Sequence, residues 1–111
     1  MSGMIRIHTT TATEDEAKRL AEVLLTRRLV ACVQIHGPVV SSYWWESKLQ
    51  ESVEWTCTIK TLAAAWDRVE AAIRDVHSYD EPQIVATEVV YVSAGYRKWV
   101  EDSVDLNSPE P

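Results

Sequence analysis

The chain has 111 residues, of which 46% are hydrophobic and 25% are charged, and its formal net charge at pH 7 is −6. A chain of this length folds as one domain that buries about two-thirds of its unfolded surface, and its composition excludes disordered and fibrous proteins. Seventeen acidic residues outnumber eleven basic ones, and no stretch gathers lysine or arginine beyond the pair at 27–28. Binding to a phosphate backbone needs clustered cations, so nucleic acid is not an expected partner.

The first elements expected are a strand and a helix. Residues 4–10 have the pattern of a short strand. Thr13 and Glu16 then have the spacing of a capping box, in which the Thr13 hydroxyl accepts the Glu16 amide and the Glu16 carboxylate reaches back to the Thr13 amide. The sequence therefore predicts a helix from this cap to about Arg28.

A long β-hairpin is predicted next, from a strand over 30–45, a turn near 46–48 and a returning strand over 49–61. The Gly37-Pro38 pair interrupts the first strand, where glycine permits a bulge and proline cannot donate to the ladder. Apolar side chains alternate along the returning strand, at Leu49, Val53, Trp55, Cys57 and Ile59. Glu51 is the one charge on that side, so we do not expect the domain's own core to bury the whole face.

The hairpin is long for its domain. Sixteen residues extend about 50 Å at 3.3 Å per residue, whereas a domain of this size has a radius of gyration near 13 Å. The hairpin must therefore bend at Gly37-Pro38 or project, carrying Trp44, Trp45 and Trp55 with it. An exposed apolar strand edge is usually covered by another subunit, so we predict a closed homo-oligomer.

The second half of the chain is expected to add a helix over 62–76, a strand over 83–92 and a short helix over 94–104. One domain over 1–104 results, and the tail 105–111 is predicted to be disordered. The order β-α-β-β-α-β plus a helix predicts the α+β class. The specific expectation is a ferredoxin-like split βαβ fold, an antiparallel sheet with both main helices on one face.

Side chains that commonly bind metals are few and scattered, at His8, Cys32, His36, Cys57 and His77. None has a chelating spacing to another. His77 is the best placed, at the end of the second predicted helix. Its imidazole either caps helix carbonyls or joins Asp80 and Glu81 in a cation site.

The charged residues of the hairpin have two readings. They form cross-strand ion pairs on a solvated face, or Glu46 and Lys60 join Tyr43 and Tyr79 in a pocket between subunits. No nucleophile and base are recognisable, which argues against an enzyme. The N-terminus lacks a leader pattern, no apolar run reaches membrane-spanning length, and both cysteines lie among strand residues, so a cytoplasmic protein is expected.

Four blocks of sequence resemble the CutA family of divalent-cation tolerance proteins. They are Leu29 to Val33, Ser42 to Glu46 followed by Lys48, Ile59 to Thr61, and His77 to Pro82. Their order and spacing span residues 4–104, nearly the whole chain.

The resemblance implies a ferredoxin-like subunit in a trimer similar to the PII signalling proteins, and a role in tolerance of divalent cations, above all copper. In copper-binding relatives a cysteine of the first strand matches Thr9, and the first of two adjacent histidines matches Val76, so only His77 keeps a ligand type. Ser47 stands where the family usually has a turn glycine.

Two functions follow as hypotheses. The first is a non-enzymatic cytoplasmic homotrimer of divalent-cation tolerance that binds copper or another cation weakly and needs no cofactor to fold. The alternative is a PII-like signalling module that binds a small metabolite in clefts between subunits.

Overall fold

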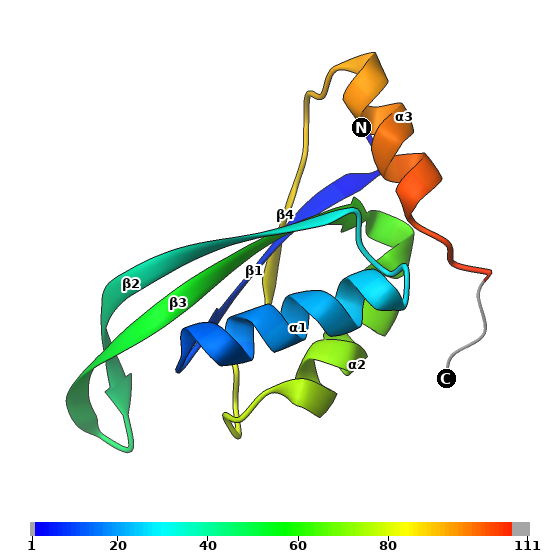
Figure 1. The fold of residues 1–111 in the computed structure, drawn as a ribbon. Coiled ribbons are helices and arrows are strands. Elements are labelled where there is room, and N and C mark those ends of the chain that lie inside the picture. The colour runs from blue at the N-terminus through cyan, green and yellow to red at the C-terminus, as the bar shows by residue number, and fades with distance from the viewer. Residues whose placement is uncertain (1, 108–111) are drawn as a thin grey trace.

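Four antiparallel strands form one sheet in the order β2-β3-β1-β4 in this computed structural model, which describes residues 2–107 (Figure 1). The elements along the chain are β1 (Met4–Thr11), α1 (Glu14–Thr26), β2 (Cys32–Trp45), β3 (Lys48–Leu62), the 3₁₀ turn η1 (Ala63–Ala65), α2 (Trp66–Val76), β4 (Val85–Glu88) and α3 (Ala94–Ser103). This arrangement confirms the α+β class and the antiparallel sheet.

The main core lies between the sheet and the helices α1 and α2. Ile7 of β1 and Ile59 of β3 are directly opposite in the ladder, and both are completely buried. Leu20 of α1 and Ile73 of α2 belong to the same buried cluster, so both helices cover one face of the sheet. A smaller cluster around Met4 and Val100 holds α3 at the far end of the sheet.

The cap of α1 differs in one bond from its prediction. The Thr13 hydroxyl accepts the Glu16 amide at 3.1 Å, as expected. The Glu16 carboxylate does not return to the Thr13 amide. It accepts the amide of Ala12 at 3.1 Å and, from the loop after α2, the amide of Ser78 at 2.7 Å. The carboxylate therefore joins the start of α1 to a segment more than sixty residues away.

The hairpin of β2 and β3 has a two-residue turn, Glu46 and Ser47, with φ of 52° and 64°. Both values are positive, which is the conformation of the tight primed turns that favour glycine. The expected irregularity at Gly37 is also present, as a register shift between His36 and Val39. A side chain at Gly37 would overlap the Trp55 indole ring, so glycine is required there for packing.

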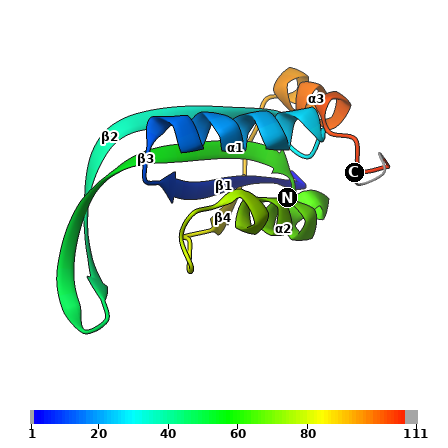
Figure 2. The same ribbon diagram turned by 60° about the horizontal axis from the view of Figure 1, so that its bottom comes forward.

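The hairpin extends past the helices and curves away from them, as both views show (Figures 1 and 2). The longest dimension of the domain is 44 Å and its Cα radius of gyration is 14.6 Å. The hairpin thus both bends and projects, which were the two alternatives that its length left open.

Three predicted boundaries need correction. The strand expected over 83–92 is paired only at Val85–Glu88, because β1 begins at Met4 and offers no partner to the residues beyond Val89. Leu62 ends β3, and a 3₁₀ turn precedes α2. Residues 105–107 of the expected disordered tail pack on the domain, and residues 108–111 lie outside the described part.

The contacts of that segment are specific. The Asp105 amide donates to the Arg28 carbonyl at 2.9 Å, and the Leu106 carbonyl accepts from Arg68 at 2.7 Å. The Leu106 side chain packs against the core. No helix within residues 2–107 is both long and apolar enough to cross a membrane.

Candidate functional site

His77 follows α2, and both nitrogens of its buried ring are engaged. Nε2 lies 2.7 Å from the carbonyl oxygen of Thr10, and Nδ1 accepts the Tyr79 amide at 3.1 Å. A carbonyl can only accept and an amide can only donate, so the ring is the neutral tautomer with its proton on Nε2. The imidazole therefore binds strand β1, and the predicted cap on helix carbonyls is wrong.

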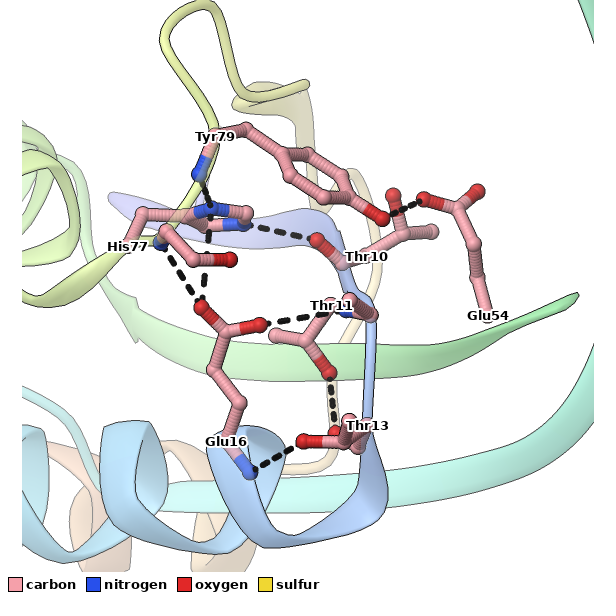
Figure 3. Close-up of polar contacts among 9 residues, drawn as sticks. Thr10, Thr11, Thr13, Glu16, Glu54, His77 and Tyr79 are labelled. Carbon is pink, nitrogen blue, oxygen red and sulfur yellow. Dashed lines mark hydrogen bonds and ion pairs between the residues drawn. The ribbon is translucent and has the colours of Figure 1, made fainter. Parts of the chain in front are cut away.

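Glu16 holds the same loop from the other side (Figure 3). Its Oε2 accepts the Ser78 amide and lies 3.9 Å from Nδ1 of His77. Burial alone would raise the pKa of Glu16, but the hydrogen bonds from Ser78 and Ala12 outweigh it, so the pKa is lowered. The folded protein thus favours the ionised carboxylate, which anchors the loop.

The anchored loop places the Tyr79 ring against the hairpin. The Tyr79 hydroxyl donates to Oε2 of Glu54 at 2.8 Å. The Tyr79 ring also lies beside the His77 ring, with 4.8 Å between their centroids. Figure 3 shows the ring reaching from the loop toward the Glu54 carboxylate. Burial first, and then the bond to Glu54, raises the pKa of Tyr79, so the phenol stays protonated and keeps donating.

A cleft of about 620 Å³ opens between this loop and the hairpin. Its lining residues are Thr10, Ser41, Ser42, Tyr43, Trp45, Glu54, Tyr79, Asp80, Glu81 and Gln83. Three are aromatic and three are acidic, and none of these ten described residues is basic. A volume of this order suits a small molecule.

The ladder register separates the two faces of the projecting part of the hairpin. Directly opposite pairs share a face. One, which we call the cleft face, carries the pairs Val39 with Glu54, Ser41 with Ser52, Tyr43 with Gln50 and Trp45 with Lys48. The other, the outer face, carries Val40 with Val53, Ser42 with Glu51 and Trp44 with Leu49, although Ser42 also borders the cleft. The two adjacent tryptophans therefore point in opposite directions.

Of the four residues predicted to line a pocket between subunits, the single chain brings two together in this cleft. Tyr43 and Tyr79 line the cleft from opposite walls. Glu46 lies in the hairpin turn, and Lys60 donates to Gln34 at 2.9 Å at the base of the sheet. Lys60 shares a face with Glu54, but six residues separate them, which is about 20 Å along a strand. Neither Glu46 nor Lys60 is among the lining residues.

The three residues that the resemblance matches to copper ligands, Thr9, Val76 and His77, do not fit a copper site. The buried Oγ1 of Thr9 has no hydrogen-bond partner among residues 2–107, so a polar atom is present, but a hydroxyl is a poor ligand for copper. Val76 offers no donor atom, and a ligand role for His77 would require one of its two hydrogen bonds to break. No three His, Cys, Asp or Glu side chains of the described residues are grouped for a metal.

The other sequence candidates lie elsewhere. Cys57 is buried in the core, and burial followed by the charge of Glu16 raises its pKa to about 11, so it is an unreactive thiol. Cys32 lies beside the Tyr96 hydroxyl, with 3.6 Å between sulfur and oxygen. His8 pairs with Thr58, and His36 with Thr56, in the sheet.

Sequence reasoning missed the two carboxylates that organise the site. Glu54 lies on the polar side of an alternating strand and resembles a solvated residue, yet only 6% of it is exposed, because Tyr79 covers it. Glu16 was recognised only as a cap. The signal for its second role was the run of polar residues after α2, whose amides need acceptors.

These features define a small α+β protein with an antiparallel sheet, a projecting hairpin and an acidic, aromatic-lined cleft. The family profile described as "CutA1 divalent ion tolerance protein" matches residues 5–103, and the chain belongs to that family. A divalent-cation tolerance protein CutA from Pyrococcus horikoshii is 33% identical over 97 residues, which cover 87% of this chain and 94% of the relative.

Solved structures agree with the family. CutA1 from Oryza sativa superposes with a TM-score of 0.91 at 30% identity, covering 94% of this chain and 95% of that one. The divalent ion tolerance protein CutA1 from Ehrlichia chaffeensis gives 0.89 at 28% identity, covering 96% and 99%.

Proposed function

We propose that this protein acts in divalent-cation tolerance as a non-enzymatic homotrimer of ferredoxin-like, PII-like subunits. One observation carries the proposal, the outer face of the hairpin. Val40, Trp44, Leu49 and Val53 are 68%, 73%, 68% and 51% exposed there. They form two directly opposite pairs, Val40 with Val53 and Trp44 with Leu49, on either side of the pair Ser42 and Glu51. Exposed apolar pairs on a projecting hairpin are typical of a protein interface.

The position of this patch favours a closed ring of identical subunits. β2 is an edge strand of the sheet, so its outer backbone groups remain available to another chain. A hairpin that reaches beyond its own domain can contact a neighbour at a different surface from its own, and such a heterologous contact forms a ring when its rotation closes. Three subunits is the number that the family resemblance supplies.

The cation would bind weakly, at the carboxylates of the cleft. Glu54, Asp80 and Glu81 give the lining a negative charge that attracts cations and repels anions. Copper and other divalent ions are candidates, because the family is named for them. The binding is weak because the described carboxylates are not grouped into a ready coordination site.

The cytoplasm is the compartment that we propose. Cys32 and Cys57 are both free thiols, which is usual in a reducing environment. A solved relative from Archaeoglobus fulgidus is described as a periplasmic divalent cation tolerance protein. Fractionation of cells that express the tagged protein decides between the two compartments.

The PII-like alternative has one observation in its favour, because the cleft is far larger than an ion and has the volume of a metabolite site. The same cleft argues against a phosphate-bearing metabolite, since its described lining offers no basic side chain. A signalling role would therefore need a ligand without an anionic group, and the carboxylates of the lining favour a cationic one.

Calorimetric titration of Cu(II) and Zn(II) tests the cation site. Glu54→Gln removes a cleft charge and keeps an acceptor for Tyr79, whereas Glu51→Gln removes a charge from the outer face of the same strand. We expect Glu54→Gln alone to weaken binding. His77→Ala shows whether the ring contributes, and equal binding by this variant and the wild type eliminates His77 as a ligand. No heat from the wild type at millimolar metal contradicts the cation role.

Light scattering with size-exclusion chromatography tests the assembly. Leu49→Ser changes the outer face, and Leu25→Ser changes an exposed leucine of α1 away from the hairpin. The proposal expects smaller particles for Leu49→Ser only. Identical masses for both variants and the wild type would remove the outer face as the interface.

A further inference from the structure

The cleft combines features that a metal ion does not use. A metal ion occupies only a small part of about 620 Å³ and is held by converging oxygen, nitrogen or sulfur atoms. Here no three His, Cys, Asp or Glu side chains of the described residues are grouped, and Tyr43, Trp45 and Tyr79 supply aromatic rings on both walls. The lining therefore suits an organic molecule.

The charges of the cleft fix the sign of that molecule. Glu81 lies 3.4 Å from the Arg74 guanidinium, but Glu54 and Asp80 have no cationic partner among residues 2–107. Glu54 is nearly fully buried, so an uncharged ligand that filled the cleft would leave its charge uncompensated at a high cost. An anion would be repelled. The ligand must be a cation.

The placement of the charges suggests more than one cationic centre. Glu54 lies on β3 in the hairpin wall, and Asp80 lies on the loop that forms the other wall. A chain with an ammonium group at each end would serve both and lay its methylene groups on the rings.

Aromatic rings favour the same ligand. The ammonium group and the methylene groups next to it are attracted to the negative faces of tyrosine and tryptophan rings. Tyr43 and Tyr79 are tethered by their hydroxyls, to Ser52 at 3.0 Å and to Glu54 at 2.8 Å, which limits the rearrangement needed on binding. Figure 3 shows the Tyr79 ring held between its loop and Glu54.

We propose that the cleft binds an aliphatic diammonium or polyammonium ion, with ammonium groups at Glu54 and Asp80 and the alkyl chain against Tyr43, Trp45 and Tyr79. A single subunit supplies all ten of these lining residues. This proposal shares with the function proposed above only the preference of the cleft for cations and does not depend on the trimer.

Isothermal titration with three probes of similar length tests the proposal. The probes are 1,4-diaminobutane, butylamine and the neutral butane-1,4-diol, each against the wild-type protein at pH 7 and constant ionic strength. The diamine should bind about tenfold more tightly than butylamine, and the diol should not bind measurably. Equal affinities for the diamine and the diol would overturn the proposal, as would no diamine binding at about 10 mM.

Matched variants locate the site. Glu54→Gln and Trp45→Leu should each weaken diamine binding by about fivefold or more. Glu51→Gln, on the outer face, and Trp99→Leu, on α3, should leave it unchanged; Trp99 is 46% exposed and Trp45 is 47% exposed. Asp80→Asn gives an independent test in an exposed loop if Trp45→Leu fails to fold. Equal losses in the controls would show surface attraction only and overturn the proposal.

The outcome separates the two proposals. Diamine binding without any response to Cu(II) or Zn(II) leaves the ammonium site standing and refutes the divalent-cation role. Metal binding without diamine binding supports the divalent-cation role and refutes the ammonium site. If a neighbouring subunit fills the cleft, the wild type binds no diamine and Glu54→Gln lowers the particle mass, which also overturns the ammonium site.

Discussion

The base and the tip of β3 carry the same alternation on the same face and have opposite environments. Cys57 and Ile59 are completely buried at the base, whereas Leu49 and Val53 are largely exposed at the tip. The helices α1 and α2 cover the base only, and the hairpin continues past them (Figure 2). Alternation therefore identifies a strand with one apolar face, but another element, or another subunit, decides whether that face is buried.

The largest expected effect is on stability. It distinguishes the base of β3 from the tip by whether the loss of stability depends on protein concentration. Ile59→Ala opens a cavity in the core and should lower the free energy of unfolding by about 2 to 5 kcal/mol. Val53→Ala, on the same face and strand, should change stability mainly through assembly, so its effect should grow with protein concentration. Urea unfolding at two concentrations measures both. A loss of stability for Val53→Ala that is as large as that for Ile59→Ala, and equally independent of protein concentration, would contradict the distinction between base and tip.

The next effect lies at the junction of base and tip. Gly37→Ala should lower the free energy of unfolding by about 1 to 3 kcal/mol, because the new methyl group overlaps the Trp55 ring. Gly95→Ala is the control, since a side chain there meets nothing within 4 Å. Thermal unfolding of the two variants checks the prediction, and equal melting temperatures would show that the junction adapts freely.

The loop that faces the tip is tied to the base by Glu16, and this tie should depend on pH. The pKa of Glu16 is lowered on folding, so its contribution is full above the unfolded pKa of about 4.3 and is lost as the pH falls through the folded value. Glu16→Gln should cost about 1 to 2 kcal/mol at pH 7 and less as the pH falls below about 4.

Denaturant unfolding across this pH range measures that difference. Glu14→Gln is the control, because Glu14 lies in the same helical turn and its ion pair with Lys18 is exposed. A penalty for Glu16→Gln that stays constant from pH 7 to pH 3 would show that its charge does not hold the loop.

The smallest effect concerns the turn at the tip. Ser47 has a φ of 64°, so Ser47→Gly should relieve strain and raise the free energy of unfolding by up to about 1 kcal/mol. The outer and cleft faces should be unaffected. Chemical unfolding measures the gain, and a lower stability would mean that the added freedom of the unfolded chain outweighs the strain.

The sequence allowed much of the fold to be predicted and less of the site. Strand alternation, the Thr13 cap and the hairpin turn are local signals, and each lies where expected within a few residues. The burial of Glu54 depends on Tyr79, twenty-five residues away, and no local pattern records such a contact. Lys60 and Glu46 lie away from the cleft of the single chain, which the sequence did not indicate, because parity gives the face of a side chain but not its position along a curved hairpin.

The central claim is that another copy of this chain covers the outer face of the hairpin. Sedimentation equilibrium of the wild-type protein at micromolar concentration tests it most directly, since the chain has a mass of 12.6 kDa. The account predicts a single species of about three times that mass, which Leu49→Ser shifts toward the single chain. A wild-type species of 12.6 kDa over the whole concentration range would contradict it.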